Sequence, residues 1–198
     1  TLDIIERINN LWDSSLDQKE KINLTLDYFI RLNSKFCMNL IVQSNIEKKD
    51  QFSEKFCSLN KEKLSNQEII NELNKIWCSN LQITIKNNLS ALFFNYFQRK
   101  ITNKMILNSL LPNEIKYRYI EKRCYLQINY SNQEIQEECN ALNESNLEFK
   151  KKNILVDQLY NQHKNKFNMK LILSIDFPLK HNLLKKLCYF DETLSETD

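Results

Sequence analysis

The pentapeptide Ser65-Asn-Gln-Glu-Ile69 is repeated letter for letter at Ser131-Asn-Gln-Glu-Ile135. In both copies a serine stands three residues before a glutamate, which is the pattern of a capping box at the start of a helix. The serine hydroxyl can accept a hydrogen bond from the glutamate N–H, and the carboxylate can accept one from the serine N–H. The two copies therefore predict two helix N-termini, and they suggest that the chain contains two related halves.

Apolar residues at intervals of three and four continue on both sides of this pentapeptide, so most of the chain is expected to be helical. Another capping box is predicted at Ser15-Leu-Asp-Gln18, and Pro112 is expected in the first turn of a helix, where its missing N–H is tolerated. Residues 81–85 alternate briefly and are interpreted as helix, whereas residues 171–177 are a candidate strand. The predicted helices cover residues 2–12, 16–43, 52–59, 66–81, 89–111, 112–124, 132–167 and 179–190, with 89–111 and 132–167 in one or two pieces.

Glycine is absent from the 198 residues, and proline occurs only twice. Phosphate-cradling loops, dinucleotide fingerprints, nucleophile elbows and calcium-binding loops need glycine where the backbone approaches a ligand or adopts a positive φ. The sequence therefore excludes these motifs, and it disfavours an all-β fold because tight hairpins lose their preferred turn residue. Hydrophobic residues make up 42%, which is typical of a folded globular chain. No apolar run approaches the roughly 18 residues of a membrane span.

The predicted fold class is all-α, with two related disulfide-stapled helical hairpin or bundle modules packed together. The first module is expected over residues 1–110 and the second over residues 111–190, and the acidic tail 191–198 is expected to be disordered. An ancient duplication would explain the repeated pentapeptide and a repeated order of cysteines. Chance identity is the alternative, because asparagine, lysine, isoleucine and leucine dominate the chain, a bias that AT-rich coding produces.

Six cysteines, an even number, suggest the disulfide framework of a secreted protein. In an antiparallel hairpin the two residues of a bridge lie equally far from the turn, so the midpoint of a pair should fall in a loop. The pairs that pass this test are Cys37–Cys57, Cys124–Cys139 and, in competition for Cys57, Cys57–Cys78. The first two would leave Cys78 and Cys188 to join the halves. In an intracellular protein the same cysteines would be free thiols.

The sequence contains no motif of a catalytic or metal-binding type. Cys-x-x-Cys pairs are absent, and the only histidines, His163 and His181, lack ligand spacing. A nucleophile pair of Cys188 with a histidine would lack a glycine-built oxyanion site. The acidic pair Glu137-Glu138 is expected to face solvent on a helix. We therefore predict that the protein is not an enzyme, holds no metal and needs no cofactor.

Positive charge is concentrated near the C-terminus, although 28 basic against 25 acidic side chains give the whole chain a formal charge of only +3. Such a region could meet phosphate, anionic lipid or an acidic partner. Without arginine forks or a nucleic-acid motif it is expected to be a solvated surface, and nucleic acid is not a predicted partner. The candidate anionic-partner face comprises Lys150, Lys151, Lys152, Lys164, Lys166, Lys170, Lys180, Lys185 and Lys186.

The spacing of cysteine and tyrosine gives the sequence a family likeness. Cys124-Tyr125 is followed by Tyr130 and Cys139, and a second Cys-Tyr pair stands at Cys188-Tyr189. In these residues and in its helical, glycine-free composition the chain resembles the bicycle proteins, aphid salivary effectors named for paired Cys-Tyr-Cys motifs. The resemblance implies a protein secreted from salivary glands into plant tissue, where it alters host development or immunity without enzymatic chemistry.

The expected function is that of a secreted effector that binds a host macromolecule, most simply a host protein, after removal of a signal peptide before Thr1. One alternative is an apicomplexan surface or invasion ligand, and another is an intracellular helical subunit of a large assembly. Asn-x-Ser/Thr sites occur about as often as chance predicts, at Asn23, Asn88, Asn129 and Asn143. The redox state of the cysteines separates the intracellular alternative from the two secreted ones.

Overall fold

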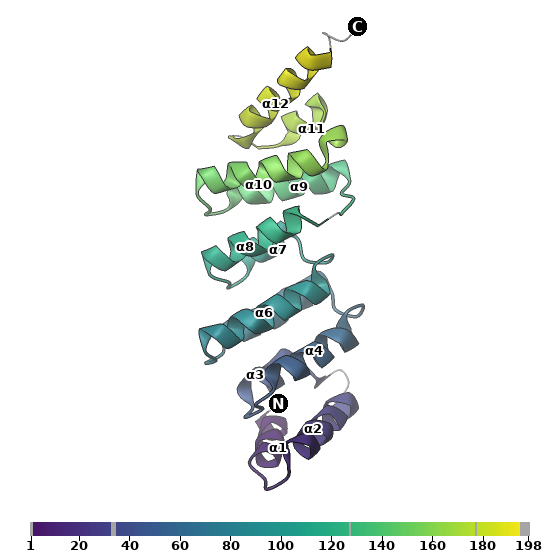
Figure 1. Ribbon diagram of the computed structural model, residues 1–198, viewed down its shortest axis with the longest axis vertical. Helices are drawn as coiled ribbons and strands as arrows, with labels where there is room; N and C mark the ends of the chain where they lie inside the picture. Colours follow the sequence, from purple (N-terminus) through teal and green to yellow (C-terminus); the bar gives the residue numbers. More distant parts are fainter. Residues whose placement is uncertain (1, 33–34, 127, 177, 195–198) are drawn as a thin grey trace. The chain divides into compact units, whose positions relative to one another are not determined.

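A computed structural model describes residues 2–32, 35–126, 128–176 and 178–194 (Figure 1). Every regular element in these residues is helical, so the all-α prediction is confirmed. The chain divides into two compact units, Thr1–Ile101 and Thr102–Asp198. This division falls nine residues before the module boundary predicted at 110/111. Within the described residues, no helix combines the length and the apolar character needed to cross a membrane.

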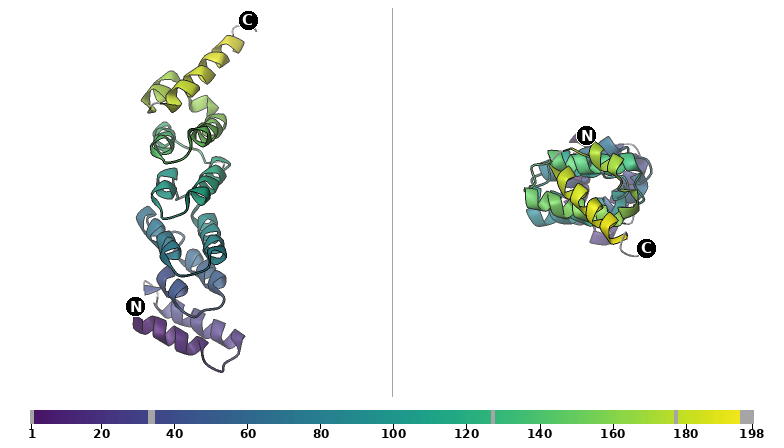
Figure 2. Two further views of the ribbon diagram at one scale, coloured as in Figure 1. Left: turned by 90° about the vertical axis from the view of Figure 1, so that its left-hand side faces the viewer. Right: turned by 90° about the horizontal axis from the view of Figure 1, so that it is seen from above.

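The first unit consists of three consecutive helical hairpins. These are α1 (Leu2–Trp12) with α2 (Gln18–Leu32), α3 (Met38–Gln43) with α4 (Lys49–Asn60), and α5 (Asn66–Cys78) with α6 (Ile83–Phe97). The first helices of successive hairpins pack together, α1 on α3 and α3 on α5, and the second helices α4 and α6 also pack together. The hairpins of this unit therefore stack in two layers (Figure 2).

The second unit has the same organisation. Its helices are α7 (Asn103–Asn108), α8 (Asn113–Cys124), α9 (Asn132–Glu144), α10 (Phe149–Gln162), the 3-10 turn η2 (Lys164–Lys166), α11 (Met169–Ser174) and α12 (Leu179–Leu194). Here α9 packs between α7 and α11 in one layer, and α10 packs between α8 and α12 in the other. The antiparallel pair α9 and α10 is seen in Figure 1.

The first helices of the six hairpins alternate in length. From α1 to α11 they have 11, 6, 13, 6, 13 and 6 residues. One long and one short hairpin thus form a pattern that occurs three times, beginning at α1, α5 and α9, where the sequence had suggested a single duplication. The repeated pentapeptide opens the second and third copies, since Ser65 caps α5 and Ser131 caps α9.

In the described residues, each of the six hairpins has a serine at or just after the end of its first helix. Its hydroxyl donates to the carbonyl three residues earlier, over 2.6 to 3.4 Å. The six serines are Ser14, Ser44, Ser79, Ser109, Ser145 and Ser174. In five hairpins a lysine ammonium group also donates to a carbonyl near the helix end, over 2.6 to 3.0 Å. These contacts satisfy carbonyl groups that helix ends leave unpaired, so the helices end without the glycine that is usual there.

The predicted capping boxes are confirmed at Ser65 and Ser131, where both reciprocal hydrogen bonds are present. The box predicted at Ser15–Gln18 is wrong. Asp17 caps α2 instead, because its carboxylate accepts the Glu20 N–H at 2.8 Å while the Glu20 carboxylate accepts the Asp17 N–H at 3.3 Å. The start of α2 therefore lies two residues later than the serine pattern suggested.

Two longer predictions are also corrected. The helix expected over residues 16–43 is interrupted, because α2 ends at Leu32 and Cys37 has extended backbone before α3. The candidate strand at 171–177 is helical through Ser174, since the Asn168 side chain caps α11 by accepting the Leu171 N–H at 2.9 Å. Phe177 lies outside the described residues.

The acidic C-terminal tail was expected to be disordered from residue 191. The helix α12 continues to Leu194, and residues 195–198 lie outside the described residues. The predicted end of this helix at residue 190 is therefore four residues too early.

Replacing Ser65 with alanine is expected to lower the free energy of unfolding of the first unit by about 1 kcal/mol, because it removes the cap of α5. Both tryptophans, Trp12 and Trp77, lie in the first unit, so urea unfolding followed by tryptophan fluorescence reports on that unit. Ser58→Ala, at an exposed position within α4, is the matched control. Equal effects of the two substitutions would contradict the capping role.

Candidate functional site

All six cysteines are free thiols, so the structure does not support the expected disulfide staples. The pairing Cys37–Cys57 assumed that residue 37 lies inside a helix, but Cys37 stands in extended backbone before α3. Cys124 and Cys139 are both buried, and the Cys124 thiol donates to the Leu155 carbonyl over 3.9 Å. The hairpins are held by packing and polar contacts in place of the predicted bridges.

The two cysteines expected to join the halves, Cys78 and Cys188, are both exposed thiols. His181 also lies exposed on α12, and no hydrogen bond between it and Cys188 is present in the described residues. Burial raises the pKa of Cys124 and of Cys139 to about 12, so these thiols stay protonated at neutral pH and are poor nucleophiles. Among the described residues no group of three or more His, Cys, Asp or Glu side chains could hold a metal ion.

The nine lysines of the candidate anionic-partner face are distributed over α10, η2, α11 and α12. Lys150–Lys152 open α10, whereas Lys164 and Lys166 follow its other end, about 20 Å away along the helix axis. Lys186 pairs with Asp157 at 3.0 Å. The lysines that the sequence groups together are thus brought to at least two separate places.

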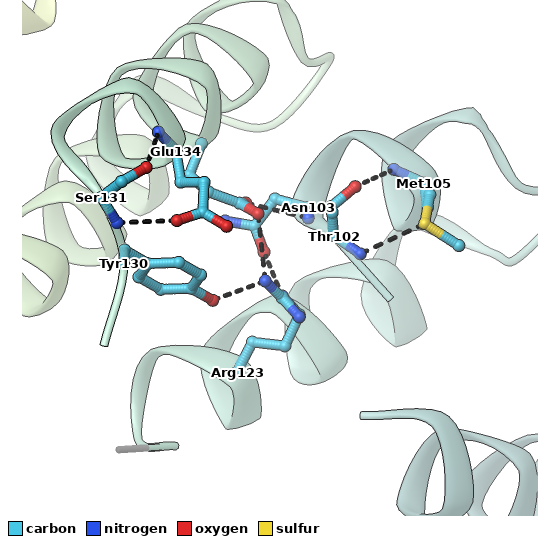
Figure 3. A network of polar contacts seen from close by, with 8 residues as sticks. Thr102, Asn103, Met105, Arg123, Tyr130, Ser131 and Glu134 are labelled. Carbon is cyan, nitrogen blue, oxygen red and sulfur yellow. Dashed lines mark hydrogen bonds and ion pairs between the residues drawn. The ribbon is translucent and has the colours of Figure 1, made fainter. Parts of the chain in front are cut away.

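The most concentrated group of buried polar side chains joins α7, α8 and α9 (Figure 3). Glu138 of α9 and Arg123 of α8 form an ion pair of 3.0 Å, with side chains only 5% and 2% exposed. The other Glu138 oxygen accepts the Asn103 N–H, at the start of α7, at 2.9 Å. Arg123 also donates to the Tyr130 hydroxyl at 2.5 Å and to Asn103 Oδ1 at 3.2 Å. We call this group, Asn103, Arg123, Tyr130 and Glu138, the α9 clamp.

The charged groups of the α9 clamp are paired with one another inside the protein, as expected for a contact that stabilises the fold. Burial raises the pKa of Tyr130 to about 12, so the phenol remains neutral. Burial also raises the pKa of Glu138, while Arg123 and the Asn103 N–H act in the opposite direction. A carboxylate is further favoured at a helix N-terminus, because the unpaired N–H groups there carry partial positive charge. The charges compensate one another within the clamp, away from solvent.

The first unit contains an equivalent contact between α5 and α3, which we call the α5 clamp. One Glu72 oxygen accepts the Met38 N–H at the start of α3 at 2.8 Å, and the other accepts from the Lys75 ammonium group at 2.6 Å. Lys75 is partly exposed, so this clamp is less enclosed than the α9 clamp. In both units, a long first helix thus holds the N-terminus of the preceding short helix.

Sequence reasoning missed these clamps. Glu137-Glu138 was expected to face solvent, but only Glu137 is exposed. The available signal was positional, because Glu72 and Glu138 each stand seven residues after the serine of the repeated pentapeptide. Seven residues are about two helical turns, which places each glutamate on the same side of its helix as the cap.

Two equivalent grooves lie on the surface, one in each unit. Each is formed by the end of a short first helix, α3 or α7, and by the turn after the next long first helix, α5 or α9. The volume of the first groove is about 340 Å³ and that of the second is about 210 Å³. The first groove is lined by Val42, Gln43, Cys78, Ser79, Asn80 and Leu81. The second groove is lined at the corresponding positions by Leu107, Asn108, Glu144, Ser145, Asn146 and Leu147, with Lys104, Asn113, Lys116 and Ala141 in addition.

The tripeptide Ser-Asn-Leu forms the turn in both grooves, and its serine fixes the backbone. The Ser79 hydroxyl donates to the Ile76 carbonyl at 2.6 Å and accepts the Leu81 N–H at 3.5 Å. In the second groove Ser145 makes the same two contacts, at 2.6 and 3.4 Å. The asparagine between serine and leucine is therefore presented on a turn whose backbone is already held.

An exposed apolar residue follows each turn by two positions. Ile83 opens α6 and is 57% exposed, and Phe149 opens α10 and is 53% exposed. Asn80 and Asn146 are exposed too, and within the described part of the chain their side chains make no hydrogen bond. Each groove thus contains an exposed asparagine, and an exposed apolar residue that is not part of the groove lining opens the helix that follows.

No protein-family model, curated protein or solved structure matches this chain. Features that occur in both units therefore indicate the candidate functional residues. Each unit contains a clamp, whose glutamate is largely buried, and a groove that is open to solvent. Of the two, only the groove can be reached by a partner.

His163, at the end of α10, is a buried histidine outside both features. Its ring packs edge-on against the Tyr130 ring at 5.2 Å, and its Nε2 atom has no hydrogen-bond partner. Burial and the nearby Lys166 ammonium group lower the pKa of His163 below its ordinary 6.5. Protonation is therefore easier in the unfolded chain than in the folded one.

The second unit is accordingly expected to lose stability as the pH falls below about 6.5, because the unfolded chain then gains a proton that folded His163 resists. Urea unfolding of the wild type and of His163→Gln at pH 7.5 and 5.5, followed by circular dichroism, measures the effect. The wild type should lose more stability between the two pH values than the variant. His181→Gln, at an exposed position, is the control and should behave as the wild type. A pH dependence that is identical in wild type and His163→Gln would refute the assignment.

Proposed function

We propose that this chain is a non-enzymatic binding protein whose stacked helical hairpins present their turns to a partner protein. The proposal rests on one observation: in both units the ionisable clamp residues are largely buried, whereas the turns that follow α5 and α9 are exposed. The Glu72 and Glu138 carboxylates are engaged inside the clamps, whereas Ile83 and Phe149 are exposed beside unpaired amides. Catalysis needs ionisable groups that a substrate can reach. Exposed apolar and amide side chains are typical of surfaces that bind another macromolecule.

The proposed setting is outside the producing cell, as a secreted effector that binds a host protein in plant tissue. The Cys-Tyr spacing at Cys124-Tyr125 and Cys188-Tyr189, which resembles that of the bicycle proteins, supports this setting. A parasite surface or invasion ligand would use the same mode of action in another host. A comparison of binding to plant extract with binding to animal-cell extract distinguishes these two settings. Binding to a plant protein would favour the effector, and binding to an animal-cell protein would favour the parasite ligand.

An intracellular helical subunit of a large assembly is the second candidate, and the six free thiols favour it. The intact mass of protein made through an oxidising secretory route, with and without reduction and alkylation under denaturing conditions, distinguishes the two. Six alkylatable thiols would favour the intracellular subunit. A mass deficit of about six hydrogens before reduction would show three bridges and favour the secreted effector.

Binding itself is tested by quantitative capture on the immobilised full chain from both extracts, followed by reconstitution with the enriched protein in purified form. A saturable complex between the two purified proteins is the expected result. Denatured full chain on the same support is the control for non-specific capture. If no enriched protein from either extract binds the purified folded chain, the proposed binding function is wrong.

A further inference from the structure

We propose that molecules of this protein associate head to tail, with helix α12 of one molecule covering helix α2 of the next. This self-association goes beyond the proposed binding function and does not depend on it. It follows from the three occurrences of the hairpin pattern, in which α2, α6 and α10 are equivalent helices and α4, α8 and α12 are equivalent helices.

Sequence and contacts establish that α2, α6 and α10 are equivalent. They begin at Gln18, Ile83 and Phe149 and have 15, 15 and 14 residues. The fourth residue of each is a lysine whose ammonium group donates to the carbonyl nine residues earlier, and these lysines are Lys21, Lys86 and Lys152. Three residues further on, all three helices have a leucine, and these leucines are Leu24, Leu89 and Leu155.

The leucine is buried in α6 and α10 but exposed in α2. Helix α6 packs on α4, and α10 packs on α8; there Leu89 is 1% exposed and Leu155 is 0% exposed. Leu24 is 48% exposed. Tyr28 and Leu32, one and two turns further along the same side of α2, are half-buried, whereas their equivalents in α6 and α10 are at most 6% exposed. We call Leu24, Tyr28 and Leu32 the α2 face.

The helices α4, α8 and α12 are equivalent by their spacing of residues. Each has a lysine, then an aromatic residue or leucine three positions later, and a cysteine eight positions after the lysine. The three sets are Lys49, Phe52 and Cys57; Lys116, Tyr119 and Cys124; and Lys180, Leu183 and Cys188. The middle residue of each set is buried, so the three helices also have the same side turned toward the core.

The cysteine of this pattern is buried in α4 and α8 but exposed in α12. Cys57 is 0% exposed and Cys124 is 1% exposed, whereas Cys188 is an exposed thiol. Leu184 and Leu187, which lie on the same side of α12 as Cys188, are half-buried. Their equivalents in α4 and α8 are at most 2% exposed. We call Leu184, Leu187 and Cys188 the α12 face.

The two faces match the two sides of a contact that the second unit already makes. In that contact the Cys124 thiol of α8 donates to the Leu155 carbonyl of α10 over 3.9 Å. Cys188 is the equivalent of Cys124, and Leu24 is the equivalent of Leu155. The α12 face of one molecule can therefore cover the α2 face of another as α8 covers α10. Because the packing between hairpins simply continues, the fitting occupant of each face is a second molecule of the same chain.

Net charge favours pairing of unlike hairpins over pairing of like ones. The first hairpin, residues 2–32, contains six acidic and four basic side chains. Residues 169–188 of the last hairpin contain four lysines and one aspartate. Two first hairpins would therefore repel each other, as would two last hairpins, whereas one of each kind attract.

The clamp is not repeated between molecules. Arg7 of α1 stands where α5 has Glu72 and α9 has Glu138, so it offers no carboxylate to the short helix of another molecule. The contact is therefore expected to lie mainly between α2 and α12 and to be weaker than the packing within a unit.

The probe is the full chain itself with its thiols reduced, studied by sedimentation velocity from about 1 to 300 µM, the range in which weak protein contacts form. Each pair of molecules keeps one uncovered face of each kind, so the mean mass should continue to rise with concentration. Alkylation of Cys188, measured by mass spectrometry, should slow as the concentration rises. Cys78, the other exposed thiol, is the internal control and should react at a constant rate.

Two variants each remove one face. Leu24→Glu removes the α2 face, Cys188→Glu removes the α12 face, and the fold should survive because both residues are exposed. The controls are Ile154→Glu and Leu173→Glu, at positions that are exposed in all three equivalent helices. Each face variant should weaken self-association by about tenfold or more, and each control should change it by less than about twofold. Circular dichroism confirms that each variant is folded.

An equimolar mixture of the two face variants tests the head-to-tail arrangement. Leu24→Glu protein keeps the α12 face, and Cys188→Glu protein keeps the α2 face. The mixture should form complexes of two molecules and none that are larger.

Three results would overturn the proposal. The first is wild-type protein that stays monomeric over the whole concentration range. The second is Cys188→Glu protein that associates as strongly as the wild type, which would indicate symmetric pairing of two α2 faces. The third is a mixture of the face variants that forms no complex.

Discussion

Replacing Glu138 with alanine is expected to lower the free energy of unfolding of the second unit by about 3–5 kcal/mol. The substitution removes the carboxylate that pairs with the Arg123 guanidinium, which is only 2% exposed, and it removes the acceptor of the Asn103 N–H. Urea unfolding followed by circular dichroism measures the loss. Tryptophan fluorescence follows the first unit separately, because both tryptophans lie there and the second unit contains none.

Two further variants make this prediction specific to the buried pair. Glu137→Ala, at the exposed neighbouring position, should change the free energy of unfolding by no more than about 0.5 kcal/mol. The double variant Arg123→Met with Glu138→Leu should recover much of the stability that Glu138→Ala loses, because an apolar pair leaves no buried charge. A loss from Glu138→Ala no larger than that from Glu137→Ala would contradict the clamp.

Replacing Phe56 with alanine is expected to lower the free energy of unfolding of the first unit by about 3–5 kcal/mol. Phe56 is 2% exposed, and its ring lies edge-on to Phe36 at 5.4 Å and stacked on Phe93 at 6.2 Å. The substitution leaves a cavity in a continuous aromatic core. That core comprises Trp12, Phe29, Phe36, Phe52, Phe56, Phe93 and Phe97.

Tryptophan fluorescence is the measurement for this substitution, since Trp12 is part of the same core. Leu59→Ala, on the same helix but 37% exposed, is the matched control and should cost about 1 kcal/mol or less. If both variants unfold at the same urea concentration, the aromatic cluster is not the core of the first unit.

Much of the fold is local in origin and was therefore predictable. Ser65 and Ser131 mark helix starts because a capping box needs only residues three apart. Apolar spacing predicted the helices α1, α5 and α8 closely, and the absence of glycine correctly disfavoured a sheet. In these places local preference and tertiary structure agree.

The errors arose where a tertiary contact or an unrecognised local cap outweighed the pattern of apolar residues. Residues 16–43 have continuous helical spacing, yet the helix is interrupted and restarts at Met38, whose N–H pairs with distant Glu72. Residues 171–177 have strand-like composition, but Asn168 caps a helix there. The midpoint rule for cysteines identifies residues that are equally far from a turn, but it does not say which way their side chains point. It therefore could not reveal that the Cys124 thiol donates to the Leu155 carbonyl.

The candidate site was harder to predict than the fold. The exposed state of Ile83 and Phe149 depends on which hairpins stack beside them, and isolated sequence segments do not contain that information. Likewise, Glu138 differs from Glu137 only in the side of α9 on which it lies. The identical Ser-Asn-Leu turns at 79–81 and 145–147 were visible in the sequence, but their role needed the position of α3 and α7 beside them.

Hydrogen exchange at the Met38 and Asn103 amides, resolved by NMR on the full chain, tests most directly whether the buried carboxylates hold the scaffold together. Amides in the first turn of a helix lack a helical acceptor and usually exchange quickly. Because Glu72 and Glu138 accept these two N–H groups, both amides should exchange only when their own unit unfolds. In the Glu138→Ala variant, the Asn103 amide should exchange rapidly and the Met38 amide should remain protected. Rapid exchange of both amides in the folded wild type would contradict the clamps. It would then also contradict the account in which the buried polar side chains stabilise the fold and the exposed turns bind a partner.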